Sequence, residues 1–256
     1  MNQDASDKLV WLQGIVSQGP KPLFATVSGA HLYGFESTDS DYDLRGAFVA
    51  PLEQVLRLRT PEETLSILEE RDGLELDWVA HDISKFARLM TRRNGYVLEQ
   101  LFSPLVVLGG SWLDELRVIG AGCVIRHLYH HYSGFVSNQR KRLEGGEQTV
   151  KRLLYCYRVL LTGIHVLRTG SIESNLTTLN DEYRIPEIPI LIERKRTGKE
   201  KGALAEGEAE SHRATLDSLQ ERLAREFESS QLPEEVSSFS HLEDFVVRAR
   251  LELGRG

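Results

Sequence analysis

Cysteine and long apolar runs are both scarce in this chain of 256 residues. Its two cysteines, Cys123 and Cys156, are far apart and form no CxxC pair. This argues against a disulfide framework or a zinc site and favours reduced thiols. No apolar run approaches the ~20 residues that a membrane-spanning helix needs. The polar, acidic start, MNQDASDKLVW, is unlike a secretory signal. These absences predict a cytoplasmic protein that does not use a membrane.

An excess of positive charge is lacking as well. The formal net charge is -7, from 31 Lys and Arg against 38 Asp and Glu. This balance argues against a basic surface that grips long duplex nucleic acid. Two local basic clusters, at residues 140–152 and 194–201, are interpreted first as solvated helix or loop faces. The composition, 41% hydrophobic and 27% charged, is that of an ordinary globular protein.

The hydrophobic pattern changes character near residue 107. Before it, LFATVSG and DYDLRGAFVA have the pattern of buried strands, and TLSILEERDGLELDWVAHD that of a hairpin turning at Asp72 and Gly73. A helix follows, with Asp82 as its N-cap. After that point the spacing of apolar residues is helical, and the predicted helices are 111–119, 122–144, 148–169, 187–196, 209–228 and 240–253.

This division predicts an α+β fold with segregated halves. Residues 1–107 would form a core with a small mixed β-sheet and flanking helices. Residues 108–256 would form a helical domain that packs on this core. The residues that indicate a chemical role lie in one short segment.

Residues 28–46, SGAHLYGFESTDSDYDLRG, combine two glycines with paired aspartates. Asp41 and Asp43 are two apart, so on a strand both carboxylates leave the same face. Asp77, on a second predicted strand, would share that face if the strands are neighbours, and Glu75 could compete for its role. Carboxylates gathered in this way repel one another unless a cation such as Mg²⁺ lies between them. The turn at Gly29 could direct backbone N–H groups toward phosphates.

These residues resemble the DNA polymerase β superfamily of nucleotidyltransferases, with its glycine, spaced Asp-x-Asp and later third acid. Within it they resemble most the RNA-ligase-associated group, also called RlaP or YcgL-like. The likeness extends through LDWVAHDISKFARLMTRRNGYVLEQLFSP, HHYSGFVSNQ and KRLLYCYRVLLTGIHVLRTG, so it covers most of residues 23–170.

The resemblance implies that residues 1–107 are a nucleotidyltransferase core and that residues 108–256 complete its nucleotide site. It also implies a catalytic and metal-binding set and a nucleotide-binding set. Asp41, Asp43 and Asp77 would bind two Mg²⁺ or Mn²⁺ ions, and Asp77 would also activate the attacking hydroxyl. The nucleotide-binding set is Ser28, Gly29, Ala30, Lys151 and Tyr155. Lys151 would contact phosphate and Tyr155 the base or sugar. The implied partners are a nucleoside triphosphate and a nucleic-acid end, with an RNA ligase as a functional partner.

One departure from the family pattern keeps alternatives open. The family's Gly-Ser is Gly29-Ala30 here, so a hydroxyl that contacts phosphate is missing. A hydrogen bond to a charged group contributes ~1.5–3 kcal/mol, so nucleotide binding would be weakened. The leading hypothesis is metal-dependent transfer of a nucleoside monophosphate to an acceptor hydroxyl. The alternatives are nucleotidylation of a protein or small molecule, and a non-catalytic nucleotide-binding or interaction module.

Overall fold

A computed structural model of the chain describes residues 3–59, 61–71, 73–198 and 202–255. Asp72 of the predicted hairpin turn and residues 199–201 of the second basic cluster lie outside the described residues. The chain divides into two compact units. The sheet unit draws on Met1–Gly29, Asp41–Cys123 and Val236–Gly256, and the helical unit on Ala30–Ser40 and Val124–Glu235.

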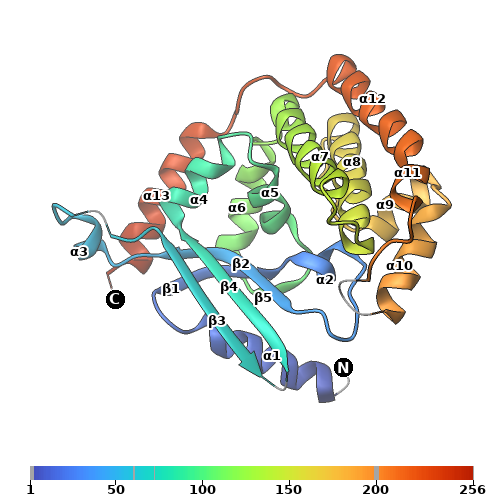
Figure 1. Ribbon diagram of the computed structural model, residues 1–256. Coiled ribbons are helices and arrows are strands. Elements are labelled where there is room, and N and C mark those ends of the chain that lie inside the picture. Colours follow the sequence, from blue (N-terminus) through green and yellow to red (C-terminus); the bar gives the residue numbers. More distant parts are fainter. Residues whose placement is uncertain (1–2, 60, 72, 199–201, 256) are drawn as a thin grey trace. The chain divides into compact units, whose positions relative to one another are not determined.

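The sheet unit is built on a mixed five-stranded sheet with the order β3-β4-β2-β1-β5 (Figure 1). The strands are β1 (Lys21–Val27), β2 (Tyr42–Val49), β3 (Thr64–Arg71), β4 (Leu74–Asp82) and β5 (Val106–Leu108). β2 and β4 run parallel, and the other neighbours run antiparallel. The predicted α+β class with a mixed sheet is confirmed, as is the β3–β4 hairpin. The sequence pattern does not predict the short strand β5.

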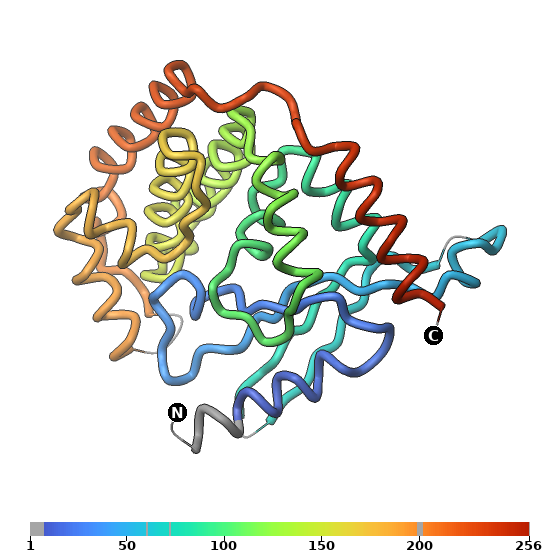
Figure 2. The backbone as a smooth tube through the Cα atoms, turned by 180° about the vertical axis from the view of Figure 1, so that it is seen from behind, coloured from blue at the N-terminus to red at the C-terminus, as the bar shows by residue number. Residues whose placement is uncertain are grey.

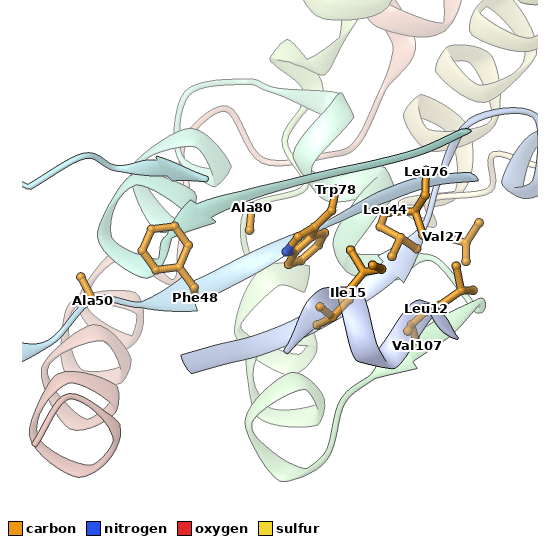
Figure 3. Close-up of a cluster of buried hydrophobic side chains, with 12 residues drawn as sticks. Leu12, Ile15, Val27, Leu44, Phe48, Ala50, Leu76, Trp78, Ala80 and Val107 are labelled. Atoms are coloured by element: carbon orange, nitrogen blue, oxygen red, sulfur yellow. The ribbon is translucent and has the colours of Figure 1, made fainter. Parts of the chain in front are cut away.

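The helices of the sheet unit are α1 (Gln3–Val16), α3 (Leu52–Val55), α4 (Ile83–Met90), α5 (Gly95–Phe102), α6 (Ser111–Ala121) and α13 (Phe239–Leu253). α1 covers one face of the sheet, and Figure 3 shows Leu12 and Ile15 of this helix beside Leu44 and Trp78. All four side chains are at most 5% exposed. Burying a side chain of this size contributes ~1.5–3 kcal/mol, so this cluster is a main source of the unit's stability.

The other face of the sheet packs against α4 and α5. Phe24 of β1 meets Phe86 of α4 edge to face, with ring centroids 5.2 Å apart. Asp82 caps α4 as predicted, since its side chain accepts a hydrogen bond from the Ser84 N–H at 3.0 Å. α13 packs beside α4 and α6 (Figures 1 and 2). The C-terminal helix of the chain therefore belongs to the sheet unit.

The helical unit contains a 3-10 turn and several α-helices. They are η1 (Arg126–Leu128), α7 (Tyr129–Glu144), α8 (Val150–Thr169), α9 (Leu176–Tyr183), α10 (Glu187–Thr197), α11 (Glu208–Ser211) and α12 (Arg213–Ser229). α7, α8 and α12 lie side by side (Figure 2). The short helix α2 (Gly29–Tyr33) begins at the last residue of a sheet-unit segment, and its other residues belong to the helical unit.

The predicted helix over residues 122–144 starts later than expected. Gly122 ends α6, and Ile125 is extended, with φ -123° and ψ 156°. Regular α-helix begins only at Tyr129, after the 3-10 turn. The β-branched residues Val124 and Ile125 favour this extended connection. Within the described residues, no helix combines the length and apolar character needed to cross a membrane.

Candidate functional site

Asp43 and Asp77 lie beside each other on two neighbouring strands of the sheet unit. β2 and β4 are parallel, and Asp43 is the register partner of Asp77. Registered residues of parallel neighbours share a face because side chains alternate along each strand. Leu44 directly follows Asp43 and Leu76 directly precedes Asp77. Both leucines are buried in the hydrophobic cluster under α1. The Asp43 and Asp77 side chains are instead 36% and 33% exposed, so a ligand can reach both carboxylates.

Asp41 lies immediately before β2 and is tied to β4. Its Oδ1 accepts a hydrogen bond from the backbone N–H of Glu75 at 3.3 Å. Glu75 is two residues before Asp77 on the same strand, and its side chain is exposed. The same pair of strands therefore positions Asp41, Asp43 and Asp77.

Arg45 joins the two registered carboxylates, and the sequence reasoning missed it. Its Nη2 lies 2.9 Å from Asp43 Oδ1 and 2.8 Å from Asp77 Oδ2. Burial opposes the charge on the guanidinium, but Tyr96 and the two carboxylates together raise the pKa of Arg45 above its ordinary value. A signal for this residue is present in the sequence. Arg45 follows Asp43 by two positions, so strand alternation alone places both on one face.

Gly29 brings the backbone into close contact with Asp43. Its φ is +62°, in the left-handed region, and a Cβ at this position would lie 1.9 Å from Asp43 Oδ2. The neighbouring Ser28 N–H donates to the Asp43 carbonyl at 2.7 Å. Any residue with a Cβ at position 29 would have to displace this carboxylate. The turn and the acid are therefore positioned together.

The two residues beside Gly29 present no exposed hydroxyl. Ser28 is 1% exposed, and its Oγ is buried without a hydrogen-bond partner. Ala30 is 7% exposed and belongs to the helical unit. The hydroxyl that Ala30 lacks is thus not replaced at the surface by that of Ser28.

Lys151 and Tyr155 lie on α8 of the helical unit, in its first two turns. The Tyr155 ring packs edge to face against Tyr33 and Phe35, with centroids 5.6 and 5.7 Å away. Arg158, one turn further along, holds its guanidinium carbon 4.0 Å from the Tyr33 centroid. The predicted nucleotide-binding residues Ala30, Lys151 and Tyr155 thus share one unit, while Ser28, Gly29 and the three acids share the other.

The donor atoms of the sheet-unit site suit a hard divalent cation. Carboxylate oxygens are what Mg²⁺ and Mn²⁺ prefer, and Asp41, Asp43 and Asp77 supply them. In the part of the chain that the structure describes, no group of three or more His, Cys, Asp or Glu side chains is arranged to hold a metal ion. Arg45 contacts one oxygen of each registered carboxylate and lies between them. The carboxylate oxygens of these residues therefore suit a divalent cation. The Arg45 guanidinium lies between the carboxylates of Asp43 and Asp77.

Comparison with known proteins finds a matching family and two similar proteins. A family model described as "RlaP: RNA repair pathway DNA polymerase beta family" matches residues 2–248. The uncharacterized protein MJ0002 of Methanocaldococcus jannaschii is 29% identical over 161 residues, which cover 61% of this chain and 65% of that protein. The match therefore spans just under two thirds of the archaeal relative.

A bacterial relative shares more of its length with the chain. The uncharacterized protein YcgL of Bacillus subtilis is 29% identical over 193 residues, which cover 72% of this chain and 73% of that protein. The family description suggests a DNA polymerase beta-type nucleotidyltransferase role in RNA repair. Because the family model matches nearly the whole sequence, the chain belongs to the RlaP family, the RNA repair pathway DNA polymerase beta family.

Proposed function

We propose that the protein transfers a nucleoside monophosphate from a nucleoside triphosphate to an acceptor hydroxyl. The observation that carries this proposal is the registered pair Asp43 and Asp77, with Gly29 pressed against Asp43. In the transfer, the hydroxyl oxygen forms a bond to the α-phosphorus, and the bond from that phosphorus to pyrophosphate breaks. Catalysis of such a step depends mainly on positioning and on charge neutralisation.

Asp41, Asp43 and Asp77 would hold Mg²⁺ or Mn²⁺. When bound, the metal supplies neutralisation of the charge on the phosphates and stabilises the attacking and leaving oxygens. Asp77 would also accept the proton that the attacking hydroxyl loses. Its side chain is one-third exposed, which leaves room for an acceptor to approach.

The triphosphate would be bound by Ser28, Gly29, Ala30, Lys151 and Tyr155. The left-handed Gly29 lets the backbone approach a phosphate, as glycines in phosphate-binding turns do. Lys151 would supply a positive charge to phosphate, and Tyr155 an aromatic surface for the base or sugar. Without a hydroxyl at Ala30, the turn would rely on backbone N–H groups.

We propose an RNA end as the acceptor, in line with the RNA repair description of the family. An RNA ligase would then act on the same ends and is the proposed functional partner. The net charge of -7 favours a short end over a long duplex. A protein or a small-molecule hydroxyl is the alternative acceptor.

The test is transfer of label from each of the four α-labelled ribonucleoside triphosphates to RNA and DNA ends, with Mg²⁺ or Mn²⁺. Asp43→Asn and Asp77→Asn should lower transfer at least about 100-fold, as loss of a transition-state charge contact does. Glu75→Gln is the matched control, because Glu75 is exposed on the same strand two residues from Asp77. It should retain activity within a few fold.

Two outcomes would overturn this assignment. Normal transfer by both Asp variants would show that the carboxylates are not catalytic, and loss of transfer in Glu75→Gln alone would move the third acid to Glu75. A non-catalytic module, which Ala30 favours, would bind triphosphate in calorimetry without releasing pyrophosphate. Label on a protein or small molecule instead of a nucleic-acid end would change only the acceptor.

A further inference from the structure

Arg45 is held in place by more contacts than its two carboxylates. Nη1 donates to the backbone carbonyls of Leu44 and Asp77, each at 2.7 Å. Nε donates to the Tyr96 hydroxyl at 3.0 Å, and the Arg45 side chain is only 12% exposed. The guanidinium is therefore anchored by the strands and by α5, with Nη2 directed between Asp43 and Asp77.

Nη2 of Arg45 lies where a metal ion would otherwise be favourable, between two carboxylates. Two half-buried carboxylates in register on adjacent strands repel each other, and a cation between them removes the repulsion. The planar guanidinium does so with directed hydrogen bonds, and it keeps its charge at all physiological pH values. It contacts Oδ1 of Asp43 and Oδ2 of Asp77, so each carboxylate gives it one oxygen.

We propose that Arg45 is a built-in counter-ion that occupies, between Asp43 and Asp77, the place of a divalent cation and positions both carboxylates. This inference rests on the proposed function for its assignment of the acids. The charges of Asp43, Asp77 and Arg45 sum to -1, and Asp41 brings the sum to -2. That charge balances one divalent ion, so we expect a second tightly bound ion only when the phosphates of the nucleotide are present.

The experiment is to remove Arg45 and ask whether Mn²⁺ replaces it. Arg45→Met should unfold at a lower temperature than wild type without metal, because the two carboxylates have lost the guanidinium that bridges them. Mn²⁺ should restore much of the loss and should stabilise wild type less. Free Mn²⁺, measured by electron paramagnetic resonance without nucleotide, should show binding to the variant at least about tenfold tighter than to wild type, allowing for screening of one unit charge.

Arg250→Met is the matched control. Arg250 is a largely buried arginine of the same unit, paired with Asp82 and hydrogen-bonded to the Ser84 hydroxyl at 3.0 Å. Asp82 also caps α4, and its Oδ2 accepts from the Ala50 N–H at 3.2 Å. This variant should lose stability as well, but Mn²⁺ should not restore it. Arg45→Lys, which keeps the charge, should bind Mn²⁺ as weakly as wild type.

The proposal is overturned if Arg45→Met binds Mn²⁺ no tighter than wild type and is not rescued by it. If Arg45→Met does not fold, the wild-type stoichiometry decides, since two tightly bound Mn²⁺ ions without nucleotide would contradict a built-in counter-ion. A single ion that is joined by a second on addition of triphosphate supports it. Rescue by Mn²⁺ without any nucleotide transfer would remove the proposed function and leave this inference standing. Nucleotide transfer by the wild type without rescue of Arg45→Met by Mn²⁺ would overturn this inference and leave the proposed function standing.

Discussion

Gly29 and Gly34 are five residues apart in sequence, yet each serves a different unit. Both have a left-handed backbone, with φ +62° and +77°. Both press against a polar side chain of their own unit. A Cβ at Gly29 would lie 1.9 Å from Asp43 Oδ2, and one at Gly34 would lie 2.5 Å from Asn175 Oδ1. The two positions present the same steric requirement to two different partners.

The partners determine what each glycine is for. Asp43 belongs to the carboxylate pair of the candidate site. Asn175 is the N-cap of α9, and its Oδ1 accepts from the Thr177 and Thr178 N–H groups at 3.0 and 3.2 Å. Gly29 thus gives a candidate catalytic acid its place, while Gly34 makes room for a helix cap. A conformational rule shared by two glycines therefore does not imply a shared role.

Gly29→Ala should have the largest effect. The new methyl group must displace Asp43, and misplacing a catalytic group by about 1 Å can cost about 100-fold in rate. We expect transfer to fall by at least that factor, with a stability cost of roughly 1–2 kcal/mol for a left-handed alanine. Labelled-nucleotide transfer and thermal unfolding measure the two effects. Unchanged transfer in a folded Gly29→Ala variant would separate this turn from the chemistry.

Gly34→Ala should affect stability and not the chemical step. The left-handed strain and the displaced cap together should cost roughly 2–3 kcal/mol of unfolding free energy. Asn175→Ala alone should cost about 1 kcal/mol through the lost cap.

A double-mutant cycle sharpens this prediction. The double variant should be less destabilised than the sum of the two single changes, because removing the Asn175 side chain also removes the clash. Urea unfolding of all four proteins gives the coupling. Simple additivity would show that the contact between Gly34 and Asn175 carries no steric cost.

The helical unit should also respond to pH through His131. Burial, and secondarily the charge of Arg158, lower the pKa of His131 from 6.5 to about 4. Between pH 4 and pH 6.5, the His131 imidazole therefore binds a proton in the unfolded chain but not in the folded protein. Stability from this group is complete above pH 6.5 and is lost as the pH falls toward 4.

His131→Gln should therefore lose less unfolding free energy than wild type as the pH falls from 6.5 toward 4. The difference should be roughly 1–2 kcal/mol once partial exposure of the side chain is allowed for. Denaturant midpoints between pH 7.5 and 4.5 measure it. The exposed His241, replaced by Gln in the same way, should follow the wild-type profile. Parallel profiles for all three proteins would contradict a proton excluded from His131.

Much of the fold follows from local pattern. The hairpin of β3 and β4 and the cap at Asp82 are predicted from alternation and from the capping preference of aspartate, and the structure contains both. The late start of α7 is different, because helical spacing of apolar residues extends through Val124 and Ile125 without forming a helix there. Periodicity reports which residues are buried, and an extended segment can bury the same residues.

The candidate site divides in the same way. Alternation along β2 places Asp43 and Arg45 on one face, and that much can be read from DYDLRG without a structure. Only the parallel register of β2 and β4 brings Asp77 opposite Asp43 and lets Arg45 bridge them. Likewise, glycine at position 34 allows the left-handed backbone through its own local sterics, whereas its contact with Asn175 depends on the tertiary structure. Steric and hydrogen-bonding preferences act over a few neighbouring residues, whereas strand register and the packing of distant segments depend on which apolar faces are buried together.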